Sequence, residues 1–176
     1  MKRIVFVGIA TAILALGVFA AIKPETFSTV EKVSVAATES DANQVLPIHV
    51  HKTATCGCCG EWIKHLEKSG FSVKYSNHED LDSIKAQFGI ENNYQSCHTG
   101  VSANGFVFEG HVPAKYIREF LNETPEDSLG LSVPAMPVGS PGMEYGNKFM
   151  PYQVLLLKKD GSASVYAEVK TYQDQF

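Results

Sequence analysis

Three cysteines within four residues form the sequence feature that most restricts how this chain can fold. The segment Cys56-Gly57-Cys58-Cys59 follows an alternating apolar stretch and precedes a run with helical spacing. The alternation predicts a strand that begins near Pro47, and the spacing of Trp62, Ile63 and Leu66 predicts a helix. We therefore expect the thiols at a helix N-terminus, where unpaired amides and the helix dipole favour thiolate over thiol.

The segments after this helix continue to alternate between strand and helix patterns. They are a strand at 71–75, a helix from Asp80 to Gly89, strands at 99–101 and 106–109, and a helix opened by Pro113. The Asn104-Gly105 pair between the two short strands is a strong hairpin signal. The order β-α-β-α-β-β-α predicts an α/β fold with a thioredoxin-like domain over residues 47–123.

The C-terminal part, residues 124–176, is predicted to be an extension that contributes to the functional site. Its first segment, 124–151, is rich in Met, Pro and Gly, holding five of the chain's eight prolines and three of its four methionines. We interpret this segment as one long loop, and loops of that length are usually functional or disordered. Strand patterns at 152–158 and 163–169 around Lys159-Asp160-Gly161 predict a closing hairpin.

The N-terminus carries an export signal. A basic start, Met1-Lys2-Arg3, precedes an apolar run that ends in small residues near Ala20 and Ala21. This pattern is typical of a signal peptide over residues 1–22, although the run is also long enough for an uncleaved membrane anchor. Residues 23–46 resemble a flexible linker. We therefore expect a periplasmic protein that contacts the membrane only through this N-terminal segment.

Charge argues against nucleic-acid binding. The formal net charge is −4 at pH 7 and becomes more negative if the signal is removed. Binding of phosphate backbones requires clustered Lys and Arg, which this chain lacks. We expect a monomer that does not bind nucleic acid.

The four cysteines admit three interpretations. Cys56 and Cys59 form a C-x-x-C pair that suits thiol–disulfide exchange. The additional Cys58, with Cys97 brought near by the fold, gives more sulfurs than a two-electron dithiol needs and suits a metal site. Purely structural disulfides are the third interpretation. Because bonds between Cys58 and its motif neighbours would be strained or awkward, that reading expects one motif thiol to pair with Cys97.

The residue types favour copper among the metals. Structural zinc sites use separated cysteine pairs, whereas thiolates and thioethers favour Cu(I). We predict Cys56, Cys58, Cys59 and Cys97 as redox-active metal ligands, and add Met136, Met143, His98 and His111 as further ligands. His49 and His51 are weaker candidates, and His65 and His78 are expected to be solvated surface residues. An iron–sulfur centre stays open, since four cysteines suffice for one.

Four motifs in order give the chain a family resemblance. Besides the Cys56–Cys59 segment these are Ser96-Cys97-His98-Thr99, Glu109-Gly110-His111-Val112-Pro113-Ala114, and the stretch from Met136 to Glu144. With them the chain resembles the CopG-type copper-resistance family over about residues 47–169. The resemblance implies a thioredoxin-like domain, a cysteine-bridged multinuclear copper cluster, and interconversion of Cu(I) and Cu(II) in support of a periplasmic efflux system. We therefore expect copper ions and a periplasmic efflux system as the partners of this chain.

Three functions follow for testing. The leading hypothesis is a periplasmic copper-binding protein that cycles Cu(I) and Cu(II) in copper resistance, which would make it a copper oxidoreductase. The second is copper storage or delivery without catalysis. The third is a thiol–disulfide oxidoreductase that uses Cys56 and Cys59 and does not need Cys58.

Overall fold

The strand predicted near Pro47 begins at Leu46 in the computed structural model, which describes residues 46–176. The predicted signal or anchor over residues 1–22 and the linker up to residue 45 lie outside the described residues. Within residues 46–176, no helix is both long and apolar enough to cross a membrane.

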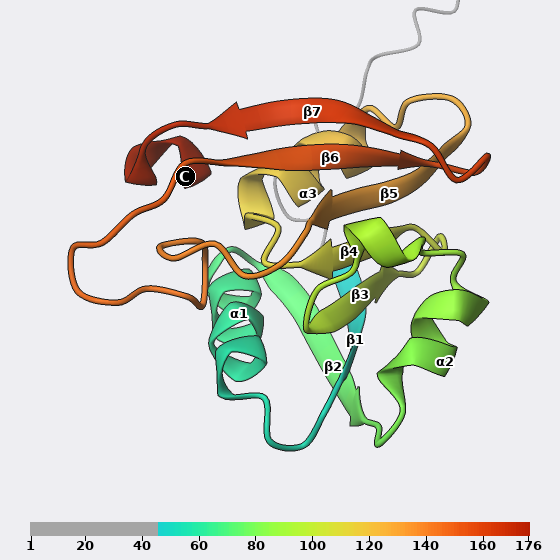
Figure 1. Cartoon of the computed structure of the whole chain (residues 1–176), viewed down its shortest axis with the longest axis horizontal. Helices are drawn as coiled ribbons and strands as arrows, with labels where there is room; N and C mark the ends of the chain where they lie inside the picture. Colours follow the sequence, from blue (N-terminus) through green and yellow to red (C-terminus); the bar gives the residue numbers. More distant parts are fainter. Residues whose placement is uncertain (1–45) are drawn as a thin grey trace, which may run out of the picture. The chain divides into compact units, whose positions relative to one another are not determined.

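The described chain has a mixed α/β fold whose elements follow the predicted order as far as α3 (Figure 1). The elements are β1 (Leu46–Lys52), α1 (Gly57–Lys68), β2 (Phe71–Asn77), α2 (Leu81–Gln87), the 3₁₀ turn η2 (Asn92–Tyr94), β3 (His98–Ser102), β4 (Val107–Gly110), α3 (Ala114–Asn122), β5 (Ser128–Val133), β6 (Tyr152–Lys158), β7 (Ala163–Val169) and η3 (Tyr172–Gln175).

Seven strands of the described chain form one sheet, in the order β2-β1-β3-β4-β5-β6-β7. β1 pairs in parallel with β2 and antiparallel with β3, and β3 pairs antiparallel with β4. β5 joins β4 in parallel, and β6 and β7 continue the sheet as the antiparallel hairpin expected from the sequence. The C-terminal segment therefore extends the same sheet.

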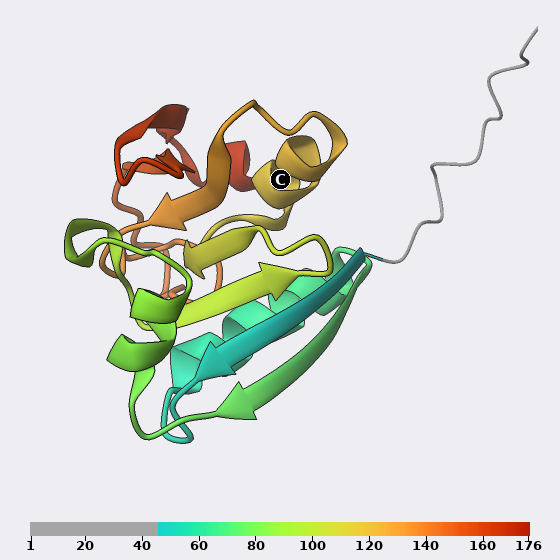
Figure 2. The same cartoon turned by 90° about the vertical axis from the view of Figure 1, so that its right-hand side faces the viewer.

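Helices cover both faces of the sheet (Figure 2). α1 and α3 lie on one face, where Trp62, Ile117 and Phe120 form the main core with strand residues such as Val50 and Phe108. α2 lies on the opposite face, near a smaller apolar cluster of Ile90, Val107 and Leu157. Period-two alternation along β1 explains the division, because Ile48 and Val50 point to one face while the residues between them point to the other.

Local signals set the helix boundaries as predicted. The Asp80 side chain accepts a hydrogen bond from the Ser83 amide and caps α2. α1 ends before Gly70, which has a φ of +86°, a left-handed conformation that glycine adopts without strain. Pro113 is the N-cap of α3, whose first residue is Ala114.

The interpretation of residues 124–151 as one loop is wrong. The segment contains β5, a central strand between β4 and β6 whose residues Leu131 and Val133 are buried in the core. Gly130 allows this close pairing, because a Cβ there would lie 1.8 Å from the Val107 carbonyl oxygen. β5 has only six residues and contains serine and glycine, so a strand pattern is hard to recognise there within a Pro- and Gly-rich segment.

Candidate metal centre

The cysteine motif occupies the first turn of α1, as its position in the sequence predicts. Cys56 is the N-cap, and Cys58 and Cys59 lie in the first turn. Cys97 lies immediately before β3, and β3 is adjacent to β1 in the sheet, so the fold brings this distant residue to the motif. Cys97 Sγ lies 4.0 Å from Cys58 Sγ and 3.6 Å from Cys59 Sγ. All four sulfurs lie within 4.8 Å of one another.

Two of the four thiols are joined in this structure. Cys56 and Cys59 form a disulfide, and Cys58 and Cys97 are free. The bond joins the C-x-x-C pair, whose Cα atoms the helical turn places 5.4 Å apart, within the usual range. It is not the bond between the motif and Cys97 that the structural-disulfide interpretation alone expects. All four sulfurs become available to a metal only after the Cys56–Cys59 bond is reduced.

Two histidines lie against Cys97. His98 Nδ1 and His111 Nε2 are each 3.2 Å from Cys97 Sγ, and both histidines are fully buried. The other nitrogen of His111, Nδ1, donates to the Pro141 carbonyl at 2.8 Å. That bond fixes the tautomer in which the Nε2 lone pair faces the sulfurs, the arrangement that orients metal-binding histidines. His98 packs on Trp62, and among the described residues its Nε2 is buried without a partner.

Burial governs protonation at this site. It raises the pKa of Cys97 to about 12, with the proximity of Cys58 adding to the effect. It also lowers the pKa of His98 well below its ordinary value and lowers that of His111. The histidines are therefore neutral and able to accept or ligate, whereas the Cys97 thiol keeps its proton until a cation displaces it. The site therefore offers sulfur and neutral imidazole donors to a cation.

The C-terminal extension lies directly against the motif. A Cβ on Gly142 would lie 2.7 Å from the Cys58 carbonyl oxygen and 2.7 Å from the Trp62 amide nitrogen, so the loop backbone touches the first turn of α1. Upstream, the Ala135 carbonyl accepts a hydrogen bond from the Ser96 hydroxyl. The predicted ligands Met136 and Met143 thus follow residues that contact the site. Met136 is half exposed, and Met143 is partly buried.

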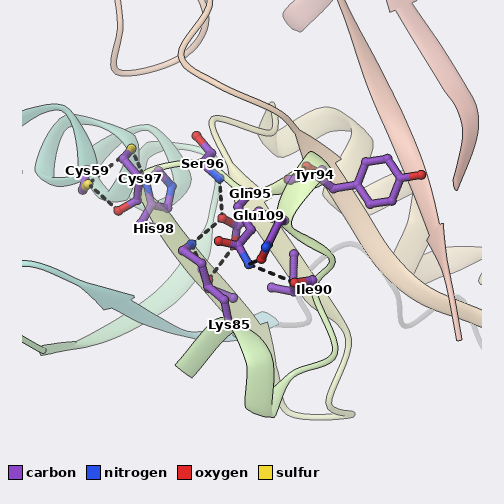
Figure 3. Close-up of polar contacts among 12 residues, drawn as sticks. Cys59, Lys85, Ile90, Tyr94, Gln95, Ser96, Cys97, His98 and Glu109 are labelled. Carbon is purple, nitrogen blue, oxygen red and sulfur yellow. Dashed lines mark hydrogen bonds and ion pairs between the residues drawn. The ribbon is translucent and has the colours of Figure 1, made fainter. Parts of the chain in front are cut away.

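A buried ion pair holds the segment that carries Cys97 (Figure 3). The Glu109 carboxylate on β4 accepts hydrogen bonds from Lys85 on α2, from the Thr99 hydroxyl and from the Ser96 amide. Both charged side chains are almost completely buried. Burial raises the pKa of Glu109, and the lysine with the other donors counters part of that effect. The network fixes the backbone one residue before Cys97.

The remaining histidines depart from the sequence-based expectation. His65 and His78 are partly buried rather than solvated. His65 Nε2 accepts a hydrogen bond from the Ala114 amide at 3.0 Å and so satisfies a free donor at the start of α3. His78 contacts His51 on β1, on the strand face that does not carry Val50. His49 and His51 are thus separated from the sulfurs, while His98 and His111 touch them.

Sequence reasoning missed several residues that shape the site. Trp62 served in the sequence only as a mark of helical spacing, yet its ring lies 4.3 Å from that of His98 and its Nε1 donates to the Val112 carbonyl. The Lys85–Glu109 pair was not recognised. A glutamate within a run of buried strand residues is the signal that could have revealed it, because an unpaired buried carboxylate is costly.

Comparisons with known proteins identify the family of this chain. Residues 94–143 match the family model described as a protein of unknown function, DUF411. No curated protein matches the chain. Two solved structures of copper resistance protein copG are similar: form 2 is 47% identical, with a TM-score of 0.68 over 72% of this chain and 99% of that one. Form 1 is 46% identical, with a TM-score of 0.68 over 73% of this chain and all of that one. With that identity over essentially their full length, and with the C-x-C-C cluster in place, this chain belongs to the CopG copper-resistance family.

Proposed function

We propose that this protein binds copper through its four cysteines once the Cys56–Cys59 disulfide is reduced. The observation that carries the proposal is a pair of donor groups that share Cys97: four sulfurs at the N-terminus of α1, and two neutral imidazoles that contact the Cys97 sulfur. Thiolates are soft ligands that stabilise Cu(I), and imidazole is a good ligand for Cu(II). The names of the similar structures support copper as the ligand.

The proposal extends to a cysteine-bridged multinuclear cluster that interconverts Cu(I) and Cu(II). Four sulfurs this close together can bridge ions that lie near one another, and the mixed donor set suits both oxidation states. Bound copper would supply one-electron chemistry, with an external partner donating or accepting the electron. The Pro141 carbonyl orients His111 so that its Nε2 lone pair is available, and His98 contributes a second imidazole, whose ring lies 4.9 Å from that of His111.

The domain organisation is proposed on the same basis. The order of the first four strands, β2-β1-β3-β4, with α1 and α3 on one face, supports a thioredoxin-like domain over residues 47–123 and an extension over 124–176.

The basic and apolar N-terminus supports export to the periplasm, by a cleaved signal or a retained anchor. There, a monomeric copper protein would serve an efflux system in copper resistance.

Elemental analysis with visible spectra tests the proposal. The full chain, exported with added copper and reduced, should retain several coppers per molecule, and Cys56→Ser and Cys97→Ser should lose most of them. Ser164→Ala, on an exposed position of β7, is the control and should match the unmodified chain. Unchanged copper content in both cysteine variants would exclude the sulfur cluster as the site.

The methionines are tested separately. Met143→Leu preserves volume and removes a soft thioether, so we expect a changed stoichiometry or spectrum. Met150→Leu is the matched control, because Met150 is exposed. If both variants resemble the unmodified chain, the extension supplies no thioether from Met143.

The Cys56–Cys59 disulfide favours a second candidate, a thiol–disulfide oxidoreductase. In that reaction a substrate disulfide would be reduced to two thiols as Cys56 and Cys59 become oxidised. Cys58 is not required for that exchange. Insulin reduction by a Cys58→Ser variant at the rate of the unmodified chain, together with weak copper binding, would support this candidate over copper chemistry.

A further inference from the structure

Three histidines gather on the face of the sheet that α2 covers. His49 and His51 alternate along β1 with Ile48 and Val50, which are buried on the face covered by α1. His78 follows β2, the neighbouring strand (Figure 2). The ring centroids of His49 and His51 lie 4.8 Å apart, and those of His51 and His78 lie 5.0 Å apart. These three histidines form a group separate from the four cysteines.

Backbone pairing builds the arrangement. β1 and β2 run in parallel, with His51 opposite Ser76. The pairing of the two strands extends by one backbone hydrogen bond beyond β2, because the His78 amide donates to the Lys52 carbonyl at 2.8 Å. Phe88, at the end of α2, packs against the His51 ring at 5.5 Å. The pairing of β1 with β2 therefore brings the His51 and His78 rings together.

The nitrogen separation matches that of two ligands on one metal ion. His51 Nδ1 and His78 Nε2 lie 2.9 Å apart. Two imidazole nitrogens bound at about 2.0 Å are separated by roughly 2.8 Å at a right angle and roughly 3.3 Å at the tetrahedral angle. The observed spacing is close to the right-angle value, which is the angle between neighbouring ligands in the tetragonal geometry of Cu(II).

A metal ion can replace the hydrogen between the two rings without any net loss of protons. Without metal, the two facing nitrogens share one hydrogen, and the metal would replace it. That hydrogen moves to the outer nitrogen of the same ring, so two neutral imidazoles bind without net proton loss. Burial, with the neighbouring His49 and His78, lowers the pKa of His51, which favours the neutral ring that can act as a ligand.

We propose that His51 and His78 form a second metal site that takes Cu(II). Imidazole-only sites bind Cu(II) more tightly than other divalent ions of the first transition row, in the Irving–Williams order. His49 lies beside this pair, with its Nε2 hydrogen-bonded to the Ser76 hydroxyl at 2.9 Å, and is not needed as a ligand. The proposal does not depend on copper binding by the cysteines.

The site is open to an ion from solvent. All three histidines are partly exposed, and His49 and His51 line a surface cavity of about 280 Å³ together with Phe88 and Lys74. Lys74 pairs with His49 in the register and places a positive charge on the lining of this cavity. Its side chain is exposed, so solvent and salt screen its repulsion of a cation.

Titration of Cu(II) followed by electron paramagnetic resonance tests the site. The full chain with Cys56, Cys58, Cys59 and Cys97 all changed to serine removes the sulfur ligands. We expect it to take up one Cu(II) whose spectrum shows coupling to at least two nitrogens. His51→Asn or His78→Asn in that background should weaken binding by at least about tenfold. His65→Gln, which removes an imidazole but keeps an acceptor for the Ala114 amide, is the control and should bind as before.

Two results would overturn the proposal. One is unchanged affinity in both His51→Asn and His78→Asn, and the other is a spectrum without nitrogen coupling. If circular dichroism shows that the cysteine-free chain is unfolded, the comparison moves to the native cysteine background, where His51→Asn should bind one Cu(II) fewer than the unmodified chain. Equal copper counts there would reject the site, whereas loss of copper in the cysteine variants alone bears only on the sulfur cluster.

Discussion

At the scale of single residues, His65 links the end of one helix to the start of another. Its side chain projects from α1 and its Nε2 accepts the Ala114 amide proton at α3. Burial lowers the pKa of His65 from 6.5, because the protonated ring would be a cation held away from water. The unfolded chain therefore binds this proton more readily than the folded chain does, and folding loses stability as pH falls below about 6.5.

We predict that His65→Gln weakens this pH dependence. Glutamine does not titrate and can accept the same bond, so the free energy of unfolding should fall less steeply between pH 6.5 and pH 5 than in the unmodified chain. Urea unfolding at several pH values gives the comparison. Parallel pH profiles for the two proteins would show that His65 is not a source of the dependence.

The buried pair of Lys85 and Glu109 makes a second residue-scale prediction. Lys85→Met leaves the Glu109 carboxylate buried without its cation, and we expect a loss of about 3–5 kcal/mol in unfolding free energy. The double variant Lys85→Met with Glu109→Leu removes both charges and should recover much of that loss. A double variant no more stable than Lys85→Met would contradict this account of the pair.

At the scale of elements, the contact between the 134–151 segment and α1 depends on Gly142. This residue has a φ of +86°, and a Cβ there would collide with the Cys58 carbonyl and the Trp62 amide. Its neighbour Pro141 holds the His111 ring. The loop therefore supports the metal centre through its backbone as well as through any side-chain ligand.

Gly142→Ala and Gly146→Ala together isolate that contact. Gly146 also has a positive φ, +57°, but a Cβ there meets nothing within 4 Å. We expect Gly146→Ala to cost about 1 kcal/mol from backbone strain alone, and Gly142→Ala to cost a further 1–3 kcal/mol, roughly, from overpacking. Denaturant unfolding measures both. The copper spectrum should change only in Gly142→Ala, and equal losses of stability in the two variants would rule out the contact.

At the scale of the whole molecule, the sheet depends on strands from the extension. β5 covers the edge of β4, and Leu131, Val133, Val154 and Val169 belong to the main core. We predict that a chain ending at Asn122 loses cooperative unfolding, because β4 becomes an exposed edge and the core loses these side chains. Thermal unfolding followed by circular dichroism checks this. A sharp transition in the truncated chain would show that residues up to 122 fold alone.

The sequence predicted those parts of the fold that depend on local signals. The Asp80 cap, the stop at Gly70 and the Asn104-Gly105 turn each act within a few residues, so they could be recognised without the fold. β5 could not, since its burial comes from pairing with β4 and β6. The histidines divide in the same way, because which of them meet depends on sheet register and not on spacing along the chain.

The sequence by itself determined which donor atoms the chain offers. Four cysteines, three of them in one helical turn, are soft donors in any fold that forms that turn, and the CopG resemblance rested on such motifs. Only the tertiary structure decided the geometry: which two cysteines are joined, that Pro141 orients His111, and that Lys85 neutralises Glu109 behind Cys97. The physical reason is that donor type belongs to each side chain, whereas distance, burial and protonation arise from residues far apart in sequence that the sheet brings together.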